Sequence, residues 1–199
     1  SEPYDGFHQM VFTEEFGPAA FITRARKEGL RDFGACMSPT SAFHILQGIE
    51  TLGMRMQRHV QNTRSIVEFL HSQDIVAKVS YPEMDGHPDQ SLASELLPRG
   101  CGAVFSFDLK GGRGAGIAFV DALDLFSHLA NVGDAKSLVI HPASTTHHRM
   151  DAAALAAGGI SEGTIRLSIG LEDCDDLIGD LKQGLRAAGK AMERQEGQR

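Results

Sequence analysis

The sequence lacks several features that would assign it to a specialised class of protein. It contains no tryptophan, two tyrosines and only three cysteines, Cys36, Cys101 and Cys174, in 199 residues. An odd number of widely spaced cysteines without a CxxC pair is typical of reduced thiols rather than of a disulfide framework, so we expect a cytoplasmic protein. No apolar run approaches the roughly 18 residues of a membrane-spanning helix, and residues 1–10 do not resemble a signal peptide.

The sequence also has no excess of basic residues. Lysine and arginine number 19 against 26 aspartates and glutamates, which gives a formal net charge of −7. Nucleic-acid-binding proteins carry a basic face, and anionic membranes attract basic segments, so we expect neither a nucleic acid nor a membrane as partner. The composition is that of a globular chain, 42% hydrophobic and 23% charged, and the chain is long enough to bury a core.

Apolar periodicity predicts an α/β chain (a small α+β domain) with a sheet of about four strands and helices packed on it. Ser38 before Pro39 is a helix-start signal, and apolar residues at three- and four-residue steps predict one long helix of about 30 residues from there to Leu70. Strands are expected at 75–82, 102–110, 136–142 and 164–170, and further helices at 18–34, 91–98, 116–130 and 171–189.

This pattern divides the chain into three parts. Residues 1–37 are expected to form an extended arm, over 1–16, and a linking helix that ends near Gly34. Residues 38–190 are expected to form one domain that begins with the long helix, which would brace two domains or a subunit contact. Residues 191–199 are a polar tail, expected to be frayed.

The segment KSLVIHPASTTHHRM (136–150) concentrates polar side chains after a predicted strand. His141, His147 and His148 are six and one residues apart, whereas zinc sites use closer histidine pairs or CxxC elements, so the spacing favours a polar loop over a metal site. Ser144 lies outside any GxSxG motif, so the sequence gives no support to a serine hydrolase.

Two other motifs have more than one interpretation. KGGRGAG (110–116) lies between a predicted strand and a helix, but Ile117 occupies the third glycine position of a dinucleotide fingerprint, so a tight turn is favoured. In TIRLSIG (164–170), Arg166 shares a face with Thr164 and Ser168, opposite the apolar residues. Its guanidinium either binds an anion in a bidentate manner or forms a salt bridge with one of the acids, and the pattern alone leaves both open.

Five segments, distributed along nearly the whole chain, resemble those of one known family of enzymes. The two most specific are LFSHLANVGDAKSLVIHPASTTH (125–147) and IRLSIGLED (165–173), supported by residues 16–26, 30–63 and 97–116. Together they resemble the C-terminal half of the Cys/Met-metabolism family of pyridoxal-phosphate enzymes, most closely its O-acetylhomoserine sulfhydrylase branch. The branch assignment depends on Lys136, which stands where synthases and lyases of the family commonly have glutamate.

The resemblance implies the C-terminal domain of a fold-type I pyridoxal-phosphate enzyme. It implies that Arg166 binds the substrate α-carboxylate, that Ser137 helps to orient the substrate, and that Thr146 is a weaker contact. The implied reaction replaces the acetate of O-acetyl-L-homoserine with sulfide or a thiol, giving homocysteine in methionine biosynthesis. Fixing the carboxylate would select which bond at Cα breaks. The histidines then need no metal.

The resemblance also implies what this chain does not carry. None of its six lysines lies in the family's S-x-T-K-type segment, so no Schiff-base lysine, and no catalytic residue, is expected here. We expect a C-terminal part of a longer homo-oligomeric enzyme, a tetramer, that is inactive alone. The alternatives are another family member (cystathionine γ-synthase or γ-lyase, or methionine γ-lyase), a non-catalytic interaction domain, and a small metal-binding protein.

Overall fold

In the computed structural model, which describes residues 2–197, the first segment of the chain is helical rather than extended. A 3-10 turn η1 (Asp5–Phe7) and helix α1 (Phe12–Phe16) lie within the arm expected over 1–16, so that prediction is wrong. The physical reason is local packing of aromatic rings, whose neighbouring centroids are 5.5 to 6.3 Å apart. The rings belong to Tyr4, Phe7, Phe12 and Phe16.

The helix expected at 18–34 is present as consecutive helical pieces. They are η2 (Gly17–Ala19), α2 (Ala20–Arg24), the π-helical η3 (Ala25–Leu30) and α3 (Arg31–Phe33). Gly34 ends this segment with a φ of 64°, a left-handed conformation that glycine adopts without steric cost. The predicted end of the helix is therefore confirmed.

The long helix expected from Ser38 to Leu70 is two helices. Ser38 caps α4 (Pro39–Glu50) as expected, because its side chain accepts a hydrogen bond from the Ser41 N–H, and α5 (Leu52–His71) follows. Thr51 has a φ of −102° and a ψ of 0° and separates them. A β-branched residue between two nearby glycines weakens a helix, which the apolar spacing did not reveal.

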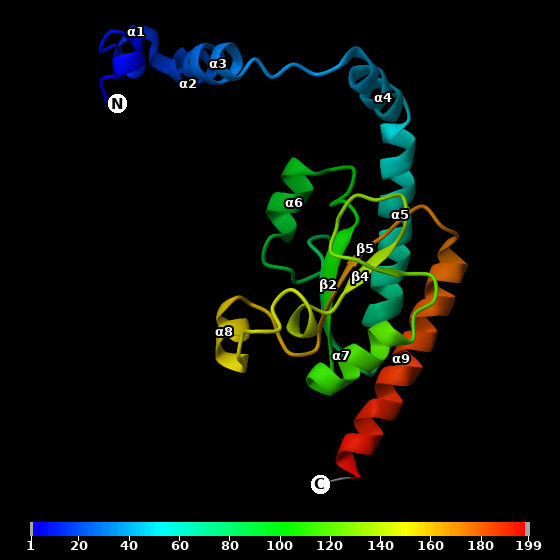
Figure 1. Ribbon diagram of the computed structural model, residues 1–199. Helices are drawn as coiled ribbons and strands as arrows, with labels where there is room; N and C mark the ends of the chain where they lie inside the picture. The colour runs from blue at the N-terminus through cyan, green and yellow to red at the C-terminus, as the bar shows by residue number, and fades with distance from the viewer. Residues whose placement is uncertain (1, 198–199) are drawn as a thin grey trace. The chain divides into compact units, whose positions relative to one another are not determined.

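The chain forms two compact units, Ser1–Thr51 and Leu52–Arg199. The division falls at Thr51 and not between residues 37 and 38, and the assignment of 38–190 to one family domain stays a prediction. The second unit contains the sheet, whose strands are β1 (Val76–Ser80), β2 (Val104–Leu109), β3 (Ser127–His128), β4 (Leu138–Ile140) and β5 (Thr164–Ser168) (Figure 1).

The sheet has the strand order β1-β2-β5-β4-β3. All neighbouring strands are antiparallel except β3 and β4, which are parallel. Four of the five strands coincide with predicted ones, and the additional strand is the two-residue β3. The mixed α/β fold class is as predicted.

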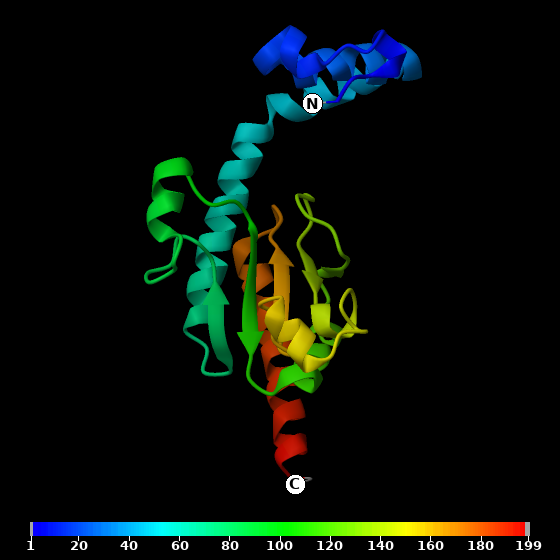
Figure 2. The ribbon, with the colours of Figure 1, turned by 90° about the vertical axis from the view of Figure 1, so that its left-hand side faces the viewer.

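Helices cover one face of this sheet. Phe107 and Ile165 point from adjacent strands into a core that α5, α7 (Gly112–Asp121) and α9 (Cys174–Glu196) complete. Leu177, Leu181 and Leu185 of α9 are buried there, as their spacing predicted. Figure 2 faces the other side of the sheet, where α6 (Gln90–Leu96) and α8 (Ala152–Ala157) flank the strands.

Several predicted helix boundaries in this unit are wrong, and one helix was not predicted. The helix expected at 116–130 ends at Asp121, and Ser127–His128 pair with β4 instead. Helix α8 was not expected, although Asp151 caps it by accepting a hydrogen bond from the Ala154 N–H. Helix α9 continues to Glu196, into the polar tail expected to be frayed, and residues 198–199 lie outside the described residues.

None of the described helices is long and apolar enough to cross a membrane.

Candidate functional site

Arg166 lies in the middle of β5, on the sheet face opposite the core. The strand alternates as predicted, because Ile165 and Leu167 are fully buried in the core while Arg166 is half-buried. Arg166 lines a cavity of about 490 Å³ together with residues from β1, β2, β4 and the loops after β4 and α8. The apolar part of the lining is Val104, Phe105, Ile140, Pro142 and Ile160.

Within the described residues, 2–197, the Arg166 guanidinium forms only one hydrogen bond. Its Nη2 donates to the carbonyl of Asn131 at 3.3 Å. No carboxylate in the described part of the chain forms an ion pair with it. The salt-bridge alternative for Arg166 is therefore not realised in this unit. Most of its hydrogen-bond donors remain available to an anion that enters the cavity.

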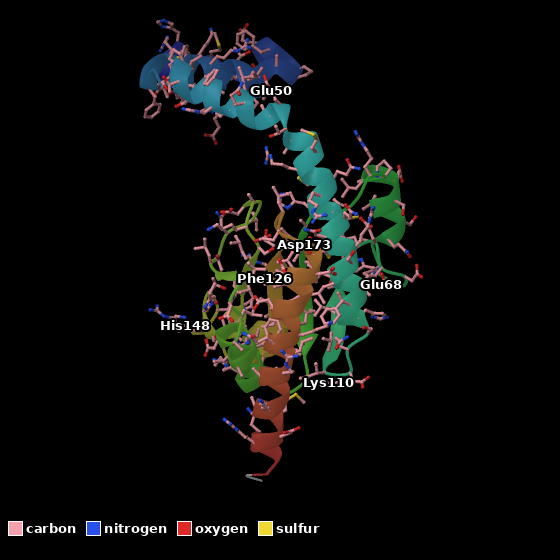
Figure 3. All side chains as sticks on the ribbon, turned by 90° about the vertical axis from the view of Figure 1, so that its right-hand side faces the viewer. Glu50, Glu68, Lys110, Phe126, His148 and Asp173 are labelled. Atoms are coloured by element: carbon pink, nitrogen blue, oxygen red, sulfur yellow. The ribbon has the colours of Figure 1, made fainter. Side chains whose placement is uncertain are left out.

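Thr146 and His147 line the same cavity, at the end of the polar loop that follows β4. Their side chains are hydrogen-bonded to one another, Thr146 Oγ1 to His147 Nδ1, at 2.8 Å. His148 forms no part of the cavity, since its Nδ1 contacts the Thr145 carbonyl at 2.8 Å and its ring points away from the body of the unit (Figure 3). In residues 2–197 no group of three or more histidine, cysteine or acidic side chains could hold a metal ion.

His141 supports this loop from beneath. It is fully buried, with Nδ1 2.8 Å from Ser144 Oγ and Nε2 2.8 Å from the Glu162 carbonyl. Since a carbonyl only accepts, Nε2 carries the hydrogen, and Nδ1 accepts from Ser144. A Cβ on Gly116 would lie 2.6 Å from the His141 Cδ2, so the ring needs a glycine beneath it. Burial lowers the pKa of His141 from its ordinary value, which favours the neutral ring.

The burial of His141 predicts a pH-dependent stability. A histidine whose folded-state pKa is lowered binds fewer protons when folded, so the free energy of unfolding should fall as the pH drops below the unfolded pKa of about 6.5. Urea unfolding of the wild type and of His141→Gln at about pH 7.5 and pH 5.5 tests this, and the variant should show the smaller pH dependence. His148→Gln, an exposed control, should behave as the wild type, and an unchanged pH dependence in His141→Gln would contradict the assignment.

Ser137 is placed differently from Arg166 and Thr146. It is fully buried and, by strand alternation, shares the core face with Val139 rather than the face of Arg166. Its N–H and Oγ–H donate to the two carboxylate oxygens of Glu172, at 2.6 and 2.9 Å, and its Oγ accepts from the Gly170 N–H at 2.8 Å. The structure thus brings Arg166 and Thr146 to one cavity and leaves Ser137 outside it.

Glu172 and its neighbours were missed by the sequence reasoning. The Glu172 carbonyl accepts hydrogen bonds from two side chains of α5, Arg58 Nη2 at 3.3 Å and Asn62 Nδ2 at 3.0 Å. Helix α5 therefore fixes the position of Glu172, whose carboxylate binds Ser137. Asn62 is buried, and its Oδ1 has no hydrogen-bond partner among residues 2–197. Glu172 follows the end of β5, where strand alternation no longer predicts direction. Only its position in the segment 165–173 could have drawn attention to it.

The residues around Arg166 do not by themselves provide a site for pyridoxal phosphate, because no lysine lines the cavity. Two lysines lie over phenylalanine rings, Lys27 and Lys182. Lys78 lines a separate cavity, and Lys110, Lys136 and Lys190 are exposed. Of KGGRGAG (110–116), Lys110 and Gly111 form the turn that the sequence favoured, whereas residues 112–116 are the first residues of α7, four residues before its expected start.

Comparison with known proteins gives a consistent result. The family model described as Cys/Met metabolism PLP-dependent enzyme matches residues 9–186. Sulfhydrylase FUB7 of Fusarium oxysporum is 48% identical over 187 residues, 94% of this chain and 43% of that protein. O-acetyl-L-homoserine sulfhydrylase 1 of Thermus thermophilus is 45% identical over 185 residues, 93% of this chain and 44% of that protein.

Solved structures agree with the fold. A structure described as an O-acetylhomoserine (thiol)-lyase of Campylobacter jejuni, with a pyridoxyl-lysine phosphate, has a TM-score of 0.79 at 37% identity. The match covers 94% of this chain and 44% of that one. A cystathionine gamma synthase of Xanthomonas oryzae has a TM-score of 0.72 at 43% identity, with 80% and 41% covered. The chain therefore spans less than half the length of the relatives that it matches.

Proposed function

The chain belongs to the Cys/Met metabolism family of PLP-dependent enzymes. We propose that it is the part of an O-acetylhomoserine sulfhydrylase that binds the α-carboxylate of the substrate. In the proposed reaction, sulfide or a thiol replaces the acetate of O-acetyl-L-homoserine and gives homocysteine. Pyridoxal phosphate, when bound in the assembled enzyme, would act as the electron sink that makes the Cα and Cβ protons removable. The sulfhydrylase names among the relatives support this branch.

The proposal depends on the environment of the Arg166 side chain, which lines a cavity and has few partners of its own. A half-buried guanidinium in a cavity, with one backbone contact and no carboxylate partner in residues 2–197, is suited to a bidentate contact with a ligand carboxylate. The α-carboxylate of an amino acid provides that group. Held there, the carboxylate would fix the orientation of Cα and so select the bond that is broken.

Thr146 and Ser137 have different parts in this proposal. Thr146 lines the cavity with Arg166, so its hydroxyl could contact the same substrate. The hydroxyl hydrogen of Ser137 is engaged by Glu172, so Ser137 would orient the substrate only after that bond is released, or indirectly, by anchoring the segment that carries Asn131 to Arg166. A homotetramer and a cytoplasmic location remain predictions.

The carboxylate contact can be tested on this chain. Titrating the ¹⁵N-labelled protein with L-2-aminobutyrate, an amino acid with no ester group, should give saturable shifts of amides around β5. Arg166→Gln should weaken this binding at least about tenfold, because a hydrogen-bonded ion pair is lost. Arg149→Gln, which removes one exposed charge from the neighbouring loop, should leave the affinity unchanged. Equal affinities for wild type and Arg166→Gln would overturn the proposal.

A further inference from the structure

Two serines extend the row of side chains that Arg166 begins. Strand register places Arg166 opposite Ile140 of β4 on one side and opposite Ser106 of β2 on the other, and Ser106 opposite Ser80 of β1. Directly opposed residues share one face of a sheet, with Cβ atoms about 4.5 to 5.5 Å apart. Arg166, Ser106 and Ser80, here called the donor row, therefore stand side by side, and all three line the same cavity.

The hydroxyl of Ser106 is free to meet a ligand. Ser106 is half-buried, and its side chain has no hydrogen-bond partner within the described part of the chain. An unpaired hydroxyl beside an arginine with one backbone contact is available to an oxygen-rich ligand as a donor. Nothing in the sequence separated Ser106 from other strand serines, because its neighbour across the sheet is sixty positions away in the chain.

Ser80, at the end of the donor row, has a side-chain contact with His87. His87 Nε2 is 3.5 Å from Ser80 Oγ, and His87 Nδ1 accepts from the Asp89 N–H at 3.2 Å. Because Nδ1 is an acceptor, a neutral His87 carries its hydrogen on Nε2 and donates it to Ser80. The hydroxyl hydrogen of Ser80 is then left to be donated into the cavity.

We propose that Ser106 and Ser80 form a subsite for a second oxygen-bearing group of the ligand whose carboxylate Arg166 binds. The three residues stand on adjacent strands, and the backbones of the outer two are two strand spacings, about 10 Å, apart. This arrangement suits an elongated ligand with an acceptor at each end. An acyl ester at the end of an amino-acid side chain has this chemistry. This inference rests on the proposed function, and it assigns to the two serines the recognition of the ester carbonyl of an O-acylated amino acid.

The subsite is tested by comparing two amino acids on the same labelled chain. O-acetyl-L-homoserine carries the ester and L-2-aminobutyrate does not. The wild type should bind the ester about threefold to tenfold more tightly, the effect of one or two hydrogen bonds. Ser80→Ala and Ser106→Ala should each reduce this preference, and the double variant should abolish it without changing the affinity for L-2-aminobutyrate.

Two further variants make the result decisive. Ser80→Thr keeps the hydroxyl on a residue that suits a strand and should retain the preference, whereas Ser94→Ala, on α6 outside the cavity, should not alter it. If Arg166→Gln loses both ligands but the double serine variant keeps the preference, the subsite is refuted and the carboxylate site stands. If neither amino acid gives saturable shifts with the wild type, both proposals are wrong.

Discussion

Replacing Asp180 with alanine is expected to lower the free energy of unfolding by about 3–5 kcal/mol. The Asp180 carboxylate is buried on α9 and accepts three backbone hydrogen bonds, from the N–H groups of Asp124, Leu125 and Phe126, at 2.9, 2.9 and 3.1 Å. Removing it would leave three amides without acceptors in a turn that lies against the core. Urea denaturation followed by circular dichroism measures the change.

A variant of the same residue type on the same helix provides the control. Asp176 is exposed in the first turn of α9, where alanine should cost only about 0.3–1 kcal/mol through the helix dipole. The loss of stability in Asp180→Asn should lie between those of the two alanine variants, since an amide oxygen still accepts hydrogen bonds but carries no charge. If Asp180→Ala were no more destabilising than Asp176→Ala, the three bonds would not be what holds this turn.

Replacing Gly170 with alanine is expected to destabilise the chain by about 2–4 kcal/mol. A Cβ at this position would lie 2.6 Å from the carbonyl carbon of Lys136 and would also meet the Ala135 carbonyl oxygen and the Glu172 carboxylate. Two of these contacts are backbone, so they cannot be relieved by a change of rotamer. Gly170 is buried and not at positive φ, and its requirement for glycine is therefore steric.

The same substitution on α9 should have the opposite sign. Gly179 is exposed in the helix interior with no atom near its missing Cβ, and alanine there should stabilise by about 0.5–1 kcal/mol. In Gly170→Ala, the Ser137 and Leu171 amide resonances should also shift, because both donate hydrogen bonds in this cluster. A Gly170→Ala protein as stable as the wild type would contradict the prediction, because it would show that the backbone at Ala135 and Lys136 moves aside at little cost.

Features that depend on short stretches of sequence were predicted correctly. Strand alternation placed Arg166 on the face of the sheet away from Ile165 and Leu167. The four-residue spacing of leucines placed one face of α9 in the core, and Ser38 and Gly34 marked a helix start and a helix end. Each of these depends on residues that are neighbours in the chain. The family was also readable from segments 125–147 and 165–173, which lie within the matched range 9–186.

Features that depend on contacts between distant segments could be seen only in the folded chain. Helix α7 stops at Asp121, and the amides of Asp124, Leu125 and Phe126 bind the Asp180 carboxylate of α9 instead of continuing the helix. No periodicity in 116–130 contains that carboxylate. The burial of Ser137 against Glu172 and the meeting of Ser106 with Arg166 follow in the same way from contacts between distant segments. A hydrogen-bond partner or a cross-strand neighbour is chosen by register and packing, which local sequence does not encode.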